Sequence, residues 1–156
     1  MTYETINRRA LLIRSVATAV VATVGSLVTA RLAFAAWNKP AFEAKSMADA
    51  YKGLGAAQTA ESGDIQILAS DIAENGAVVP LQAVSKIPGT TQISFLVEKN
   101  PNMLAAVFDI GPDLVPDVTT RIKMGQTSNI IVLVKAGDKY FTATKEIKVT
   151  LGGCGG

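Results

Sequence analysis

The sequence predicts an all-β domain, a sandwich of about seven strands, preceded by a short N-terminal helix and a cleaved signal peptide. The chain of 156 residues is 49% hydrophobic and 18% charged, which is too apolar for a disordered protein and too short for two large domains. A basic and then apolar segment opens the chain, as in an exported protein. After Gly63 the apolar residues recur with the period of two that is typical of strands.

The first 35 residues have the layout of an export signal. Arg8, Arg9 and Arg14 precede the uncharged stretch 15–30, and Ala33-Phe34-Ala35 then offers the small side chains that a signal peptidase accepts. The uncharged stretch is shorter than the roughly 20 apolar residues that span a bilayer, so we expect residues 1–35 to be removed and no stable membrane anchor to remain. The adjacent arginines resemble a twin-arginine signal, which predicts export to the periplasm by that route.

The charge balance gives no support for nucleic-acid binding. Of the 15 Lys and Arg, four lie in residues 1–35, and of the 13 Asp and Glu, one does. The remaining chain therefore has eleven basic and twelve acidic side chains, a net charge of −1. Nucleic-acid binding depends on a clustered basic face, which this balance does not indicate.

The mature chain, from Ala36, is expected to open with one helix. Pro40 suits a first helical turn, and Gly53-Leu54-Gly55 supplies a stop. Apolar side chains recur between them at three- and four-residue spacing, at Phe42, Ala44, Met47, Ala48 and Tyr51.

Seven segments after Gly63 are predicted strands. Turn-forming Gly, Pro, Asn and Asp residues separate them. The segments are Ile65–Ala69, Ala77–Val84, Thr91–Val97, Leu104–Ile110, Asp117–Lys123, Asn129–Lys135 and Tyr140–Leu151. Short strands with a turn about every dozen residues favour an immunoglobulin-like sandwich, so we expect residues 36–151 to form one domain of a helix and this sandwich.

The residue types present exclude several kinds of chemistry. The chain has no His, which removes Ser-His-Asp and Cys-His nucleophilic devices and His-ligated metals. Its one Cys cannot close an internal disulfide or form a thiolate zinc site. We therefore expect no metal, no cofactor and no catalytic residue.

Three local patterns have simple structural interpretations. Asn75-Gly76 predicts a tight turn with positive φ. Asp109 and Asp113 are expected to be turn residues, because nothing near them would separate their pKa values as acid–base catalysis requires. Arg121 and Lys123 share the outer face of their strand, which is either a solvated face or a docking patch for an anionic partner.

The C-terminal pentapeptide is the most unusual part of the sequence. Residues 152–156 are four glycines, Gly152, Gly153, Gly155 and Gly156, around the single thiol of Cys154. Glycine has the greatest backbone freedom, so this composition predicts a thin, flexible arm. Cys154 lies five positions after Val149, which lets the sulfur reach at most about 17 Å from the sheet edge. A free thiol in an oxidising compartment is a liability unless it is used.

The segment Ile147–Gly156 resembles the C-terminus of the SoxY family, the carrier subunits of bacterial thiosulfate oxidation. Ile72–Pro80, Asn100–Phe108 and Thr120–Lys123 also match that family's pattern. The resemblance implies an immunoglobulin-like sandwich that pairs with a SoxZ-like subunit and holds sulfur intermediates on Cys154. It further implies partner enzymes that act on this cargo: a haem enzyme that joins thiosulfate to the thiol, a hydrolase that releases sulfate and, where present, a sulfane dehydrogenase.

The residues by themselves also favour a carrier over an enzyme. A thiol on a flexible arm can hold an intermediate but has few groups here with which to transform it. The alternative is an exported structural module that uses Cys154 for an intermolecular disulfide. Sulfur carriers of ubiquitin-like shape are a third interpretation, but they use a terminal Gly-Gly carboxylate, whereas here Cys154 precedes the last two glycines.

Overall fold

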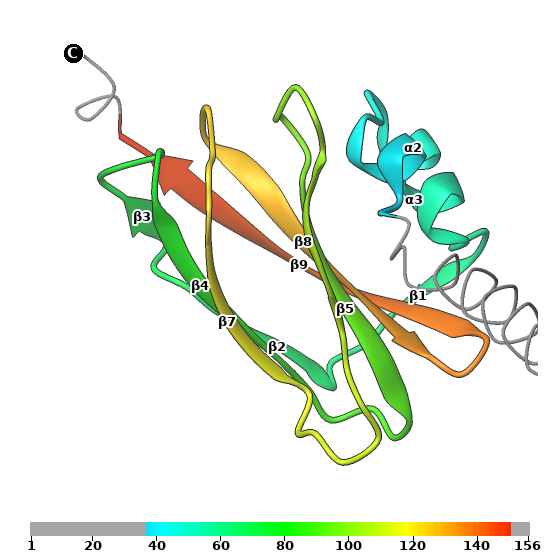
Figure 1. Ribbon diagram of the computed structural model, residues 1–156. Helices are drawn as coiled ribbons and strands as arrows, with labels where there is room; N and C mark the ends of the chain where they lie inside the picture. The colour runs from blue at the N-terminus through cyan, green and yellow to red at the C-terminus, as the bar shows by residue number, and fades with distance from the viewer. Residues whose placement is uncertain (1–36, 151–156) are drawn as a thin grey trace, which may run out of the picture. The chain divides into compact units, whose positions relative to one another are not determined.

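The structure is a computed structural model that describes residues 37–150 (Figure 1). The chain divides into two compact units, Met1–Trp37 and Asn38–Gly156, and the second contains the fold described below. Two helices open it, α2 (Lys39–Phe42) and α3 (Met47–Leu54). Within the described range, neither helix has the length and apolar character needed to cross a membrane.

Nine strands follow the helices in the described residues. They are β1 (Thr59–Glu61), β2 (Ile65–Leu68), β3 (Ile72–Ala73), β4 (Val79–Ser85), β5 (Thr90–Val97), β6 (Leu104–Asp109), β7 (Asp117–Ile122), β8 (Ser128–Ala136) and β9 (Lys139–Val149). All seven predicted strands are present, with their described ends within two residues of the prediction. The short strands β1 and β3 were not predicted.

The strands form two sheets that enclose the core. The larger sheet has the order β1-β9-β8-β5-β6, with β3 also paired to β9, and the smaller has the order β2-β4-β7. The main core fills the space between the sheets and includes Phe95, Val132 and Ile147 from the larger sheet and Leu81 and Ile122 from the smaller. This arrangement confirms the predicted all-β, immunoglobulin-like sandwich.

The helices cover a second, smaller core against the larger sheet. Ala41 of α2 and Ala50 of α3 are fully buried there, together with Leu96 and Leu133 from the sheet. These leucines alternate along their strands with residues of the main core, so they lie on the opposite, outer face of the larger sheet.

The prediction of one continuous helix is wrong, because the segment breaks between Phe42 and Met47. Ser46 has an extended backbone, and its side chain accepts a hydrogen bond from the backbone N–H of Asp49, so it starts a second helix as an N-cap. Gly55 ends α3 with φ 77°, as the predicted stop requires. Gly53 lies within α3, where a Cβ would come within 2.7 Å of Cα of Ala41, so it permits the close packing of the two helices.

Candidate functional site

The candidate site is the end of β9 from which the predicted carrier arm continues. Cys154 and the glycines at 152, 153, 155 and 156 lie outside the described residues, as do residues 1–35 of the predicted signal. The structure does describe Val149 and Thr150, the residues that lead into the arm. The part of the site that the structure describes is therefore the end of β9, which precedes the arm (Figure 1).

The end of β9 donates backbone hydrogen bonds to β3 and to the residue that precedes it. The two strands run parallel, with Ile72 beside Lys148 and Ala73 beside Val149. Lys148 N donates to Asp71 O at 2.9 Å, and Thr150 N donates to Ala73 O at 3.1 Å. The short strand β3 therefore continues the pairing of β9 to its last residue, Val149, and also accepts a hydrogen bond from Thr150.

A side chain holds the other edge of β9. The antiparallel pairing with β8 ends at Ser128 and Ile147. Beyond it, Val149 N donates to the hydroxyl oxygen Oγ1 of Thr127 at 3.0 Å. Thr127 thus supplies the acceptor that a longer β8 would have supplied through its backbone.

Gly76 packs directly against the end of β9. A Cβ at this position would lie 2.8 Å from Cγ1 of Val149 and 2.4 Å from the carbonyl oxygen of Met124. Met124 N also donates to Gly76 O at 2.7 Å. We call Val149, Thr150 and the three residues that hold them, Ala73, Gly76 and Thr127, the arm root.

The predicted turn at Asn75-Gly76 is confirmed, but the predicted positive φ at Gly76 is wrong. Val78 N donates to Asn75 O at 3.3 Å, and Ala77 N donates to Oδ1 of Asn75 at 2.9 Å, which closes a turn. The glycines with positive φ in the described residues are Gly55, Gly89 and Gly137. Glycine is needed at position 76 because neighbouring atoms occupy the place of a Cβ.

The turn that carries Thr127 is itself fixed by Asn100. The Asn100 side chain donates from Nδ2 to Lys123 O at 2.7 Å and accepts at Oδ1 from Gly125 N at 3.1 Å. Asn100, Lys123 and Gly125 also line a cavity of about 460 Å³ together with Pro101 and Asn102. These contacts place the β7–β8 turn, and with it Thr127, at the end of the sandwich from which the arm leaves.

The strand that was expected to expose Arg121 and Lys123 does so. Ile122 and Met124 are buried, whereas Arg121 and Lys123 are exposed. Neither cation forms an ion pair with any residue between 37 and 150. Both cations are therefore accessible to solvent or to an anionic partner on the outer face of the smaller sheet.

Asp109 and Asp113, which are expected to be turn residues, lie apart from the arm root, and only Asp113 lies in a turn. Asp109 ends β6, and its Oδ1 accepts a hydrogen bond from Nε2 of Gln92 at 2.8 Å. Asp113 lies in the turn that leads toward β7. Among the described residues, no group of three or more His, Cys, Asp or Glu could hold a metal ion.

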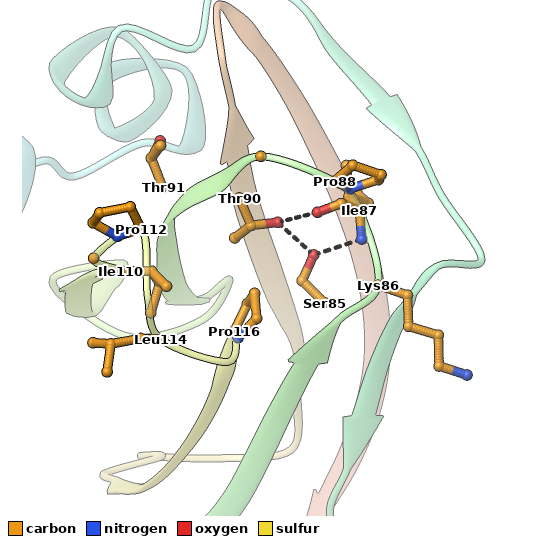
Figure 2. Close-up of a pocket in the computed structure, with 12 residues that line it drawn as sticks. Ser85, Lys86, Ile87, Pro88, Thr90, Thr91, Ile110, Pro112, Leu114 and Pro116 are labelled. Atoms are coloured by element: carbon orange, nitrogen blue, oxygen red, sulfur yellow. Dashed lines mark hydrogen bonds between the residues drawn. The ribbon is translucent and has the colours of Figure 1, made fainter.

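A second cavity, of about 530 Å³, lies at the opposite end of β4 (Figure 2). Its lining includes Ile110, Pro112 and Leu114. The buried hydroxyls of Ser85 and Thr90 also line it and form a hydrogen bond with each other, with 2.8 Å between Oγ and Oγ1. β4 has seven residues, so about 20 Å of strand separates this cavity from the arm root. The described hydroxyls stabilise the β4–β5 turn.

The missed residues carry weak sequence signals. Thr127 is one of many threonines near a turn, and only the fold brings its hydroxyl to Val149. β3 has only two residues, of which Ile72 is exposed and Ala73 buried, and so is too short for a periodic pattern. Gly76 was recognised as a turn residue, but its contact with Val149, 73 positions later, depends on the pairing of β3 with β9.

Comparison with known proteins identifies one family. The family model described as "Sulfur oxidation protein SoxY" matches residues 51–154. No curated protein matches the chain in sequence. The solved sulfur carrier protein SoxY from Chlorobium limicola f thiosulfatophilum is 41% identical, with a TM-score of 0.59, over 65% of this chain and 93% of that one.

Two other solved structures share the fold alone, and both are forms of the superoxide reductase (neelaredoxin) from Ignicoccus hospitalis. One is 17% identical over 58% of this chain and 83% of that one, with a TM-score of 0.51. The other is 18% identical over 64% of this chain and 87% of that one, with a TM-score of 0.50. At these identities the likeness concerns the sandwich and carries no activity to this chain.

Proposed function

This chain belongs to the SoxY family of sulfur oxidation proteins, and on that premise we propose that it is a sulfur carrier whose Cys154 thiol holds the intermediates of thiosulfate oxidation. The observation that carries this proposal is the extent of the family match. The match covers most of the sandwich and runs through position 154, which is the single cysteine of the chain. The geometry of the arm root supports it, because a firmly held strand end precedes the glycine-rich segment.

The chemistry requires a thiol that can be reached by several enzymes in turn. In the loading step, the thiol and thiosulfate form a sulfur–sulfur bond, and one proton and two electrons leave, the electrons to a haem enzyme. In the next step, water cleaves the terminal sulfonate as sulfate and a proton, and a persulfide remains on Cys154. A sulfane dehydrogenase, where present, would oxidise that remaining sulfur.

In this proposal the chain carries the cargo and the partners supply the catalysis. The side chains of the arm root are aliphatic or hydroxyl groups, and Gly76 has none. We further propose a SoxZ-like subunit as the stable partner, since the family resemblance implies a SoxYZ heterodimer. The reach of about 17 Å that five extended residues provide would let the thiol enter a cleft in a visiting enzyme while the sandwich stays outside.

We propose that the protein works in the periplasm after twin-arginine export. Arg8 and Arg9 and the following apolar stretch support this location. Replacing both arginines by Lys should retain the chain in the cytoplasm, which fractionation would detect. If that variant still reaches the periplasm, the twin-arginine route is wrong, although export by another route would remain.

Mass spectrometry of the terminal tryptic peptide, Val149–Gly156, tests the carrier function. Protein isolated from cells oxidising thiosulfate should contain thiosulfonate or persulfide adducts on this peptide, and a Cys154→Ser variant should contain none. The second candidate, an intermolecular disulfide module, rests on the same lone cysteine and predicts only disulfide-linked peptide. Finding that peptide alone would overturn the carrier proposal.

A further inference from the structure

Two neighbouring residue pairs flank the arm root, and each combines one apolar and one cationic side chain. Ile72 of β3 lies beside Lys148 of β9 in the parallel pairing. On the smaller sheet, β4 and β7 pair Val79 with Ile122, and continuing this antiparallel register by one residue places Val78 opposite Lys123. We call Ile72, Lys148, Val78 and Lys123 the arm collar.

The two pairs lie on opposite outer faces of the sandwich. Ala73 and Val149 belong to the main core or pack against it, so Ile72 and Lys148, one position earlier, point away from it on the larger sheet. Val79 and Ile122 are buried in the same core, so Val78 and Lys123 point away from it on the smaller sheet. The two pairs therefore lie on either side of the strand end at Val149.

The collar exposes apolar surface and carries positive charge. Ile72 is 53% exposed and Val78 is 50% exposed, which makes them two of the exposed large hydrophobic residues of the described range. Neither Lys123 nor Lys148 forms an ion pair within residues 37–150. Of the acidic residues close by in sequence, Asp71 is paired with Lys145 at 2.9 Å, whereas Glu74 and Glu146 are exposed carboxylates with no ion pair in the described residues.

The length of the arm limits where a visiting enzyme can bind. Cys154 lies five positions after Val149, so the sulfur lies at most about 17 Å from Val149 even when the chain is fully extended. If the reactive centre of an enzyme lies several ångströms inside a cleft, the mouth of that cleft must lie closer to Val149 than the sulfur does. Its surface will then contact the residues around the arm root.

We propose that the arm collar is the docking surface for the enzymes that process the cargo on Cys154, an inference that rests on the proposed carrier function. The occupant is an enzyme whose cleft mouth presents apolar side chains and an excess of carboxylates, complementary to the two exposed aliphatic side chains and the two lysines. Because each such enzyme must take the same short arm, each binds the same collar. Enzymes acting on successive intermediates therefore compete for it.

The test compares the full chain with a peptide that has the arm but no collar. The probe is the thiosulfate-conjugating haem enzyme, with either reduced full-length protein or synthetic Val149–Gly156 peptide as the thiol substrate. The wild-type chain should have a KM roughly tenfold lower than the peptide, with similar kcat, because docking adds binding without altering the reacting atoms. The variant Ile72→Thr/Val78→Thr/Lys123→Glu/Lys148→Glu should lose most of this difference.

A matched variant at the far end of the molecule controls for general surface effects. Leu114 and Val115, 63% and 77% exposed, lie in the turn before β7. Lys86, just after β4, and Lys139, at the start of β9, are exposed lysines at this same end of the sandwich. The variant Leu114→Thr/Val115→Thr/Lys86→Glu/Lys139→Glu should keep the wild-type KM. Unfolding of each protein in urea confirms that the domains remain folded, and a charge-only variant, Lys123→Glu/Lys148→Glu, should show a weaker salt dependence of KM than the wild type.

The outcomes separate this inference from the proposed function. Equal KM values for chain and peptide, or equal losses in the collar and far-end variants, overturn the docking surface while the carrier function stands. Failure of the enzyme to load either substrate overturns the carrier function. A KM that rises only in the collar variants supports both.

Discussion

The Cα of Gly76 faces the side chain of Val149 with no space for a further carbon atom, since a Cβ would lie 2.8 Å from Cγ1 of Val149. The same Cβ would lie 2.4 Å from the carbonyl oxygen of Met124. A backbone carbonyl cannot move aside as a flexible side chain can. Gly76 therefore determines how closely the β3–β4 turn packs on the strand end from which the arm continues.

Gly76→Ala should destabilise the domain by about 1–3 kcal/mol, the usual cost of overpacking. The free energy of unfolding, measured in urea, checks this. Gly63→Ala is the matched control, because no atom lies within 4 Å of a Cβ at Gly63, and its stability should stay within about 0.5 kcal/mol of the wild type. Equal stabilities for the two variants would contradict the steric role of Gly76.

Thr127→Val should loosen the end of β9, because it removes the acceptor of the Val149 N–H at 3.0 Å while keeping the side-chain volume. We expect a loss of about 1 kcal/mol in stability and faster hydrogen exchange at the Val149 amide. Thr127→Ser keeps the hydroxyl and should retain protection of that amide. Unchanged exchange in the valine variant would show that this hydrogen bond does not hold the arm root.

The sandwich could be predicted from the sequence because its long strands have strong apolar patterns. β8 and β9, with nine and eleven residues, place alternate side chains in the core. β1 could not be found in this way, since all three of its residues are exposed. The break between the helices did have a signal, Ser46-Met47-Ala48-Asp49, in which a serine N-cap precedes an acidic residue three positions later.

The arm could be predicted from composition, whereas its root could not. Four glycines around one cysteine are visible in the sequence itself. The contacts of Val149 with Thr127 and Gly76 join residues 22 and 73 positions apart, and they exist only because β3 and the β7–β8 turn meet at the end of β9. A local sequence pattern cannot predict contacts between residues so far apart in the chain.

Ser94→Ala should leave the stability unchanged or raise it by up to about 1 kcal/mol, because a buried hydroxyl without a partner costs free energy that alanine does not incur. Ser94 is 1% exposed, and its hydroxyl makes no hydrogen bond with any described residue. Thermal unfolding checks this, with Ser128→Ala as the contrast: the Ser128 hydroxyl accepts from Lys99 N at 3.0 Å, so its loss should destabilise. A clear destabilisation by Ser94→Ala would reveal a partner for its hydroxyl.

Tyr51 should make the domain less stable at strongly alkaline pH. Burial, with a smaller contribution from the negative charge of Glu98, raises the pKa of Tyr51 above its ordinary value of 10.0. Because the unfolded chain then loses the proton at lower pH than the folded chain, the stability from this group is complete below about pH 10 and falls as the pH rises through the folded pKa. Urea unfolding from about pH 8 to about pH 11 should show a steeper loss for the wild type than for Tyr51→Phe. Parallel curves would contradict the raised pKa.

Replacing Gly152 and Gly153 by Pro should slow enzymatic loading of Cys154 without changing the fold. Proline fixes φ and removes backbone freedom, so the thiol would explore fewer of the positions that an enzyme cleft requires. We expect kcat/KM with the thiosulfate-conjugating haem enzyme to fall by about tenfold, since misplacing a reacting group by about 1 Å is already costly. Gly152→Ala/Gly153→Ala retains more backbone freedom than the proline variant and should lose less. A small disulfide reagent needs no cleft, so its reaction rate with Cys154 should be similar in all three proteins. Loading of the proline variant at the wild-type rate would show that the arm's freedom is not what lets the enzyme reach the thiol.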